Sequence, residues 1–107
     1  MKNGVEKLTD VMAQFLGHTA IVLPDDVKEK LADLRDKEDT PMAKVIYRTM
    51  FRNQELAEEL QRPSCQDTGV PQFWVQCGTK FPYIDDMETL LRKAVVQATF
   101  DTPLRHN

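Results

Sequence analysis

The chain has 107 residues, of which 41% are hydrophobic and 29% charged, and its formal net charge is −3 at pH 7. This length allows one domain with a modest core, and the acidic balance argues against a nucleic-acid partner, because phosphate binding needs a basic face. No apolar run approaches the roughly 20 residues that span a membrane, and residues 1–7 lack the apolar stretch of a secretory signal, so the sequence predicts a cytoplasmic protein.

Three helices are predicted in the first half of the chain. The first is marked by apolar residues at helical spacing, and Gly17 is its expected end; these residues are Val5, Leu8, Met12, Phe15 and Leu16. A second helix is predicted from Pro24 to about Lys37, because proline suits the first turn and two aspartates follow at the positive end. A third starts at Thr40 and Pro41 and keeps helical period to Gln61.

The second half of the chain changes character. Residues 72–77 (QFWVQC) are aromatic and β-branched and lie between a proline and a glycine, which is a strand pattern. The segment that follows either completes a hairpin or forms a loop, and Asp85 with Glu88 three residues on has capping-box spacing for a last helix. The predicted fold class is α+β and mainly helical, with about four helices and a short strand or hairpin near residues 72–83.

The loop at residues 62–69 (RPSCQDTG) combines a soft metal ligand, hydrogen-bonding side chains and a turn residue after a helix-breaking proline. Cys65 is the cysteine in a setting suited to a ligand, since thiolate is what iron–sulfur clusters and zinc select. One thiolate cannot hold a cluster, and Cys77, twelve residues on, forms no CxxC motif with it. The alternative for both cysteines is burial as small apolar residues.

Together with its flanking segments, this loop resembles the start of the iron–sulfur hydro-lyases. That family contains the class I fumarases and the alpha subunits of L(+)-tartrate dehydratase. The resemblance is carried by residues 62–69 and by the tail at residues 103–107 (PLRHN), with forty residues between Cys65 and Arg105. Residues 24–27 and 46–51 are similar to the tartrate dehydratase alpha subunit as well, so the resemblance covers nearly the whole chain.

The resemblance implies a [4Fe-4S] cluster that is held by three cysteines and has one iron open to a 2-hydroxy dicarboxylate. That iron acts as a Lewis acid in the dehydration of tartrate to oxaloacetate, or in the interconversion of fumarate and malate. Cys65 matches the first cluster ligand. Gln66 and Asp67 match residues that contact substrate, and Asp67 is the candidate for proton transfer. Arg105 matches an arginine that binds a substrate carboxylate, where a planar guanidinium fits two oxygens.

Family alpha subunits continue beyond the segment that residues 103–107 match, and they supply the other two cluster cysteines there. We therefore interpret residues 1–107 as a single domain, the N-terminal part of an alpha region that is incomplete relative to the family. Its implied partners are the rest of the alpha region, a beta subunit or domain, and further copies in an oligomer. Alone, the chain is expected to bind no cluster and to be inactive.

Two alternatives to a hydro-lyase fragment stay open at this point. The chain could be a non-catalytic helical interaction module, or a degenerate paralogue that keeps only the fold. Free-standing zinc or thiol chemistry at Cys65 is a third and weaker reading. The sequence leaves open whether the chain is itself an enzyme and which dicarboxylate the complete protein would use.

Overall fold

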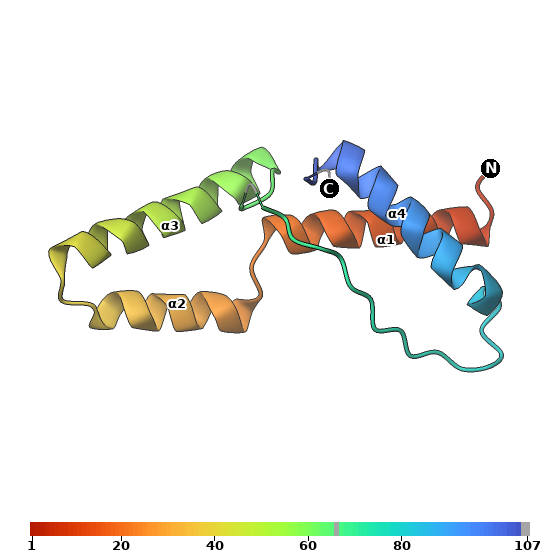
Figure 1. Ribbon diagram of the computed structural model, residues 1–107, viewed down its shortest axis with the longest axis horizontal. Coiled ribbons are helices and arrows are strands. Elements are labelled where there is room, and N and C mark those ends of the chain that lie inside the picture. The colour runs from red at the N-terminus through yellow and green to blue at the C-terminus, as the bar shows by residue number, and fades with distance from the viewer. Residues whose placement is uncertain (66, 106–107) are drawn as a thin grey trace.

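A computed structural model describes residues 1–65 and 67–105 (Figure 1). The described part contains four α-helices and one 3₁₀ turn: α1 (Gly4–Ile21), α2 (Asp25–Lys37), α3 (Pro41–Leu60), η1 (Ile84–Asp86) and α4 (Met87–Asp101). Within these residues there is no β-strand. The α+β fold class predicted from the sequence is therefore wrong, and the described chain is all helical.

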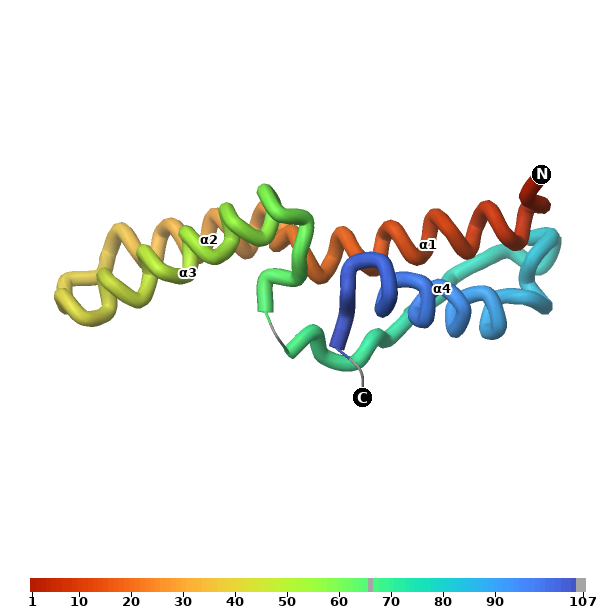
Figure 2. The backbone as a smooth tube through the Cα atoms, turned by 90° about the horizontal axis from the view of Figure 1, so that it is seen from above, coloured from red at the N-terminus to blue at the C-terminus, as the bar shows by residue number. Residues whose placement is uncertain are grey.

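Helices α1 and α4 lie against each other and contain most of the core (Figures 1 and 2). Ala13 of α1 packs with Ala94 and Ala98 of α4, and all three are buried. Leu90 of α4 is the largest fully buried side chain in the described residues. Small side chains at the contact let the two helix backbones approach closely, but they bury little apolar surface each, so this core stabilises the fold only modestly.

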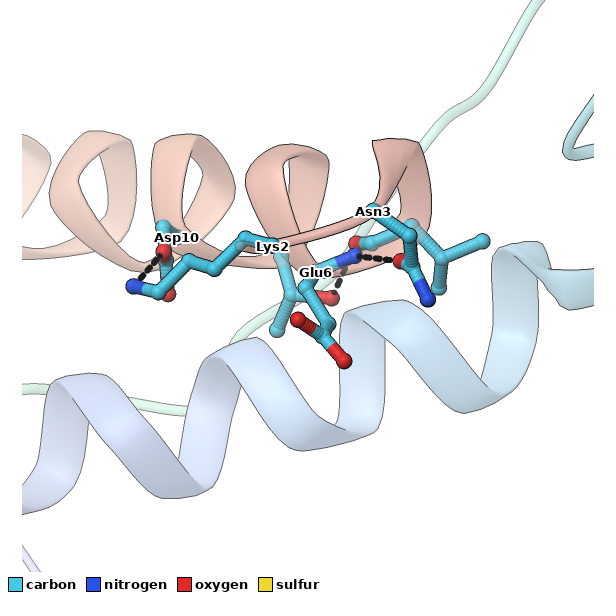
Figure 3. A network of polar contacts seen from close by, with 6 residues as sticks. Lys2, Asn3, Glu6 and Asp10 are labelled. Atoms are coloured by element: carbon cyan, nitrogen blue, oxygen red, sulfur yellow. Dashed lines mark hydrogen bonds and ion pairs between the residues drawn. The ribbon is translucent and has the colours of Figure 1, made fainter.

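The first turn of α1 is closed by polar side chains that precede it in the sequence (Figure 3). The side-chain oxygen of Asn3 accepts a hydrogen bond from the backbone N–H of Glu6 at 2.9 Å, which satisfies one of the free donors of the helix start. Lys2 pairs with Asp10 along the same side of the helix, and this hydrogen bond lowers the pKa of the Asp10 carboxyl. These contacts begin the helix just before the first apolar residue of its stripe.

Helix α1 continues through Gly17 to Ile21, so the predicted end at Gly17 is wrong. Gly17 is buried where α1 meets the end of α4, and a Cβ built on it would lie 2.6 Å from the Oγ1 atom of Thr102. The glycine is therefore needed for the close approach of another segment rather than for a left-handed helix end.

Helices α2 and α3 form an antiparallel hairpin that extends away from the α1–α4 pair (Figure 1). α2 starts after Pro24 and α3 starts with Thr40 as N-cap and Pro41 in the first turn, as predicted. Lys28 of α2 pairs with Glu58 of α3 at 2.8 Å, and the Arg35 guanidinium lies 4.4 Å from the centre of the Phe51 ring.

This hairpin gives the molecule an elongated shape of 55 × 28 × 25 Å. The radius of gyration is 17.5 Å, whereas a compact domain of this length has about 13 Å. Helix α2 has no buried residue, and α3 buries only Ala57. The hairpin is therefore held by surface pairs and half-buried side chains rather than by a core of its own. No helix in the described part is long and apolar enough to cross a membrane.

The segment between α3 and α4 runs as an irregular, elongated connection along the molecule (Figure 1). It leaves α3 at Gln61, which has a left-handed backbone with φ of 54°, and it ends in the η1 turn. Residues 72–77 lie in it and were predicted to be a strand. Residues 70–77 make no backbone hydrogen bond within the described residues, so their β propensity finds no neighbouring strand to stabilise it.

The predicted capping box before the last helix is also wrong. Asp85 lies inside η1, and the residue at the N-cap of α4 is Asp86, whose side chain makes no capping hydrogen bond. The 3₁₀ turn brings the chain into α4 by backbone hydrogen bonds instead, with the Asp86 N–H donating to the Tyr83 carbonyl at 3.1 Å. Helix α4 ends at Asp101, two residues before Pro103, because a proline cannot continue a helix.

Candidate functional site

The loop that carries Cys65 is hydrogen-bonded to α1 and α3 at Ser64, the residue before the cysteine. The backbone N–H of Ser64 donates to the carbonyl of Ala20 near the end of α1, at 2.9 Å. The side-chain amide of Asn53 on α3 donates to the Ser64 carbonyl at 2.6 Å. Both polar groups of the Ser64 backbone are thus bonded to helices, which fixes the point from which Cys65 extends.

Both cysteines of the chain are free and exposed, which contradicts the alternative that they are small buried residues. Cys65 lies in the attached loop, whereas Cys77 lies in the irregular connection between α3 and α4. No group of three or more histidine, cysteine, aspartate or glutamate side chains in the described residues could hold a metal ion. Cys65 can therefore act as one ligand of a metal group, and the remaining ligands would have to come from outside this set.

The loop and the C-terminal tail meet through Asp67 and Arg105. The Nη1 atom of Arg105 is 3.2 Å from the Oδ1 atom of Asp67, and the Arg105 backbone N–H donates to the Oγ1 atom of Thr68 at 3.0 Å. The Gly69 N–H donates to the same carboxylate oxygen at 3.1 Å, with Gly69 at a φ of +73°. These contacts bring together segments that are about forty residues apart in sequence.

An open hollow of about 700 Å³ lies beside this contact. Cys65, Thr68 and Arg105 line it, together with apolar and basic neighbours: Arg62, Pro63, Phe100, Pro103 and Leu104. Arg62 also donates to the Thr102 carbonyl at 3.4 Å, which connects the start of the loop to the end of α4. A thiol and a guanidinium on one open surface form a donor set that can hold a soft metal and a carboxylate next to each other.

Three of the four residues predicted for the site, Cys65, Asp67 and Arg105, are therefore brought together, and Gln66 lies outside the described residues. The sequence did not predict the hydrogen bonds by which Thr68 and Asn53 hold the tail and the loop in place. Thr68 stood inside the loop motif, so its hydroxyl was a visible candidate. Asn53 lies in the middle of a helix, and nothing in its local sequence marks it as the partner of a loop eleven residues later.

The described part of the chain is all helical, and its cysteine-containing loop contacts the arginine of the C-terminal tail. Comparison with known proteins gives the family of the chain. The family model described as fumarate hydratase (Fumerase) matches residues 9–107. The chain belongs to this family, and the resemblance inferred from the sequence is confirmed.

The chain is similar to curated members that are considerably longer. It is 44% identical over 106 residues to the L(+)-tartrate dehydratase subunit alpha of Escherichia coli (strain K12), covering 99% of this chain and 35% of that protein. It is 35% identical over 103 residues to the putative L(+)-tartrate dehydratase subunit alpha of Methanocaldococcus jannaschii, covering 94% of this chain and 36% of that protein. The chain spans about a third of the length of these relatives and corresponds to their N-terminal portion.

Proposed function

We propose that this chain is part of a [4Fe-4S] hydro-lyase that removes water from, or adds it to, a 2-hydroxy dicarboxylate such as tartrate or malate. The observation that supports this most directly is the meeting of Cys65, Asp67 and Arg105 at one surface. Membership of the fumarate hydratase family and the similarity to tartrate dehydratase alpha subunits support the reaction class. The rest of the site would come from segments that these 107 residues do not include.

Cys65 fits the part of a cluster ligand. Its thiol is exposed and follows a residue that is fixed by two hydrogen bonds, and thiolate is the ligand type that iron–sulfur clusters select. Cys65 would supply one of three thiolates. When bound, the cluster would polarise the substrate hydroxyl as a Lewis acid.

Arg105 and Asp67 would exchange partners when a dicarboxylate binds. Their ion pair is exposed, with the Arg105 side chain 54% and the Asp67 side chain 68% accessible, so it stabilises the loop by only about 0–1 kcal/mol. A substrate carboxylate can therefore replace the Asp67 carboxylate on the planar guanidinium. Asp67 would then be free to contact the substrate and to hold or move a proton there.

The implied partners are the remainder of the alpha region and a beta subunit. The similar proteins are named as alpha subunits, and this chain covers 35% of such a protein. A non-catalytic helical interaction module is the second candidate function. It is favoured by one observation, the exposed apolar side chains along α3, which the proposed reaction does not use.

Substitution of the two cysteines tests the proposal. The chain would be produced without oxygen together with the segments that complete the enzyme, and cluster absorbance and turnover of tartrate and malate would be measured. We expect Cys65→Ser to lose the cluster, because a serine hydroxyl is a hard and poorly ionised ligand. The matched control Cys77→Ser should keep it, since Cys77 lies outside the loop. Equal cluster loss in both variants would contradict the assignment of Cys65.

A further inference from the structure

Two contacts join Arg105 to the loop, and they use different parts of the arginine. The Nη1 atom of its guanidinium lies 3.2 Å from the Asp67 carboxylate, whereas its backbone N–H donates to the Oγ1 atom of Thr68 at 3.0 Å. The first contact occupies the group that the proposed reaction assigns to the substrate. The second contact leaves that group free, so it can persist while the guanidinium changes its partner.

The two contacts also differ in their surroundings. Both side chains of the Asp67–Arg105 ion pair are exposed, so salt screens their attraction and a substrate carboxylate can displace Asp67. Thr68 is half-buried, and its hydroxyl is neutral, so its hydrogen bond does not depend on a charge that the substrate would neutralise. The backbone contact is therefore the one suited to hold the tail once the ion pair opens.

The hydrogen bond to Thr68 connects the C-terminal tail directly to the loop that carries Cys65, beside which the tail lies (Figure 2). The preceding residue, Leu104, is bonded to α4 instead, since its N–H donates to the Thr99 carbonyl at 3.2 Å. Thr68 follows Cys65 by three positions. Its hydroxyl thus sets the place of the Arg105 backbone relative to the cysteine, whereas the bond of Leu104 sets the tail only relative to α4.

We propose that Thr68 is a positioning residue, whose hydroxyl keeps Arg105 beside Cys65 when a substrate carboxylate replaces Asp67 on the guanidinium. This inference rests on the proposed function, because it takes Arg105 as the group that binds the substrate. An arginine that is already in place lowers the ordering cost of binding. Loss of the hydroxyl should therefore weaken the binding of the dicarboxylate more than it slows the chemical step.

The positioning is tested without any reaction by the heteronuclear NOE of the Arg105 amide in the 107-residue chain. We expect a lower NOE in Thr68→Val, because valine keeps the β-branched shape but offers no acceptor. Thr68→Ser should keep the wild-type value, since it keeps the hydroxyl. Asp67→Asn should keep it as well, because asparagine removes the charge but retains an oxygen for the Gly69 N–H. A lower NOE in Asp67→Asn with an unchanged one in Thr68→Val would overturn the proposal.

Steady-state kinetics of the completed enzyme with tartrate and malate test the consequence for the substrate. We expect Thr68→Val to raise KM about tenfold, the effect of losing one hydrogen bond, with kcat near the wild-type value. Thr68→Ser should restore the wild-type KM. Thr49→Val is the matched control and should be neutral, because the exposed Thr49 hydroxyl donates to the Val45 carbonyl of its own helix at 3.0 Å. Cluster absorbance and Tm should stay near wild type in all three variants.

Failure of this inference would look different from failure of the proposed function. A wild-type KM in Thr68→Val, or a Thr68→Ser variant as weak as Thr68→Val, would overturn the role of Thr68 while cluster and turnover remain. Loss of the cluster in Thr68→Val would overturn it too, because a residue that positions Arg105 should leave the cluster in place. Failure of the proposed function would appear in the wild type itself, as a completed enzyme without cluster or turnover.

Discussion

The surroundings of Arg105 indicate a role in ligand binding rather than in folding. Its backbone N–H is used by Thr68, but its side chain is half exposed and meets only the exposed Asp67 carboxylate among the ion pairs of the described residues. An exposed pair of this kind contributes little to stability. The fork-shaped guanidinium is thus available for a ligand, and a change that keeps the charge but alters the shape should affect binding more than folding.

We expect Arg105→Lys, placed in the completed enzyme, to lower kcat/KM by at least ~100-fold, or about 2.7 kcal/mol of transition-state stabilisation. Lysine keeps the positive charge but cannot bind two carboxylate oxygens as a planar fork. Steady-state kinetics with tartrate and malate would measure this, while cluster absorbance and Tm should stay near wild type. Arg92→Lys on α4, which changes an exposed arginine paired with Glu88, is the control and should be neutral. Near-normal kcat/KM in Arg105→Lys would contradict the role in substrate binding.

The residues of the site were predictable to the extent that they belong to a local motif. Cys65, Asp67 and Arg105 could be selected because the loop and the tail each carry a distinctive run of residues at a defined separation. The anchoring of the loop could not be predicted. It depends on Asn53 and on the Ala20 carbonyl, which come near Ser64 only after α1 and α3 have packed. Contacts of this kind have no pattern in the sequence around them.

At the scale of elements, the contact of α1 with the end of α4 depends on the absence of a side chain at Gly17. A Cβ at this position would lie 2.6 Å from Thr102 Oγ1, which is closer than such atoms normally come. We expect Gly17→Ala to destabilise the chain by about 1–3 kcal/mol, although alanine in place of glycine inside a helix usually stabilises by up to about 1 kcal/mol.

Urea unfolding followed by circular dichroism would measure the effect of Gly17→Ala. The double variant Gly17→Ala/Thr102→Ala should recover stability, because it removes the hydroxyl that the new Cβ would meet. Gly78→Ala is the control, since no heavy atom lies within 4 Å of a Cβ built there. If Gly17→Ala proves as stable as the wild type, the helices do not approach as closely as the structure has them.

The four helices were predicted from the sequence, whereas the predicted strand is absent from the described residues, and the difference has a physical reason. A helix such as α3 carries its own signals, since a threonine and a proline start it and its hydrogen bonds lie within the segment. A strand needs a neighbour, and the aromatic run at residues 72–77 has none among the described residues. The end of α1 was misplaced because a glycine that serves packing looks in sequence like a glycine that ends a helix.

The Lys28–Glu58 pair between α2 and α3 should make stability depend on pH. The hydrogen bond from Lys28 holds the pKa of Glu58 below its ordinary value of 4.5. A carboxyl whose pKa is lower in the folded state stabilises the fold above its unfolded pKa and loses that contribution as the pH falls. As the pH falls below 4.5, we therefore expect the Tm of the wild type to decrease more steeply than that of Glu58→Gln.

Thermal melts across about pH 3 to 7 would compare these proteins. Glu29→Gln is the matched control, because Glu29 is an exposed carboxylate of α2 that makes no ion pair within the described residues. Its pH profile should follow that of the wild type. If Glu58→Gln and the wild type show the same profile, the pair does not connect the two helices in solution.

The molecule as a whole has more surface than its length requires. Its radius of gyration of 17.5 Å exceeds the roughly 13 Å of a compact domain of this length. Four of the seven buried apolar residues in the described part are alanines: Ala13, Ala57, Ala94 and Ala98. Such a core offsets little of the conformational entropy lost on folding, so the isolated chain should be only marginally stable. Contacts from other polypeptide segments would add the missing burial.

We expect the isolated chain to hold no stable [4Fe-4S] cluster after anaerobic reconstitution and to show no turnover of tartrate or malate. It has two cysteines, only one of which lies in the loop, whereas the proposed cluster needs three thiolates. Adding the segments that complete the alpha region and the beta subunit should bring cluster absorbance and activity. The added segments should also raise the Tm of this chain, because a partner that binds only the folded state stabilises it. A stoichiometric cluster with turnover in the isolated chain would show that Cys65 finds its fellow ligands without those segments.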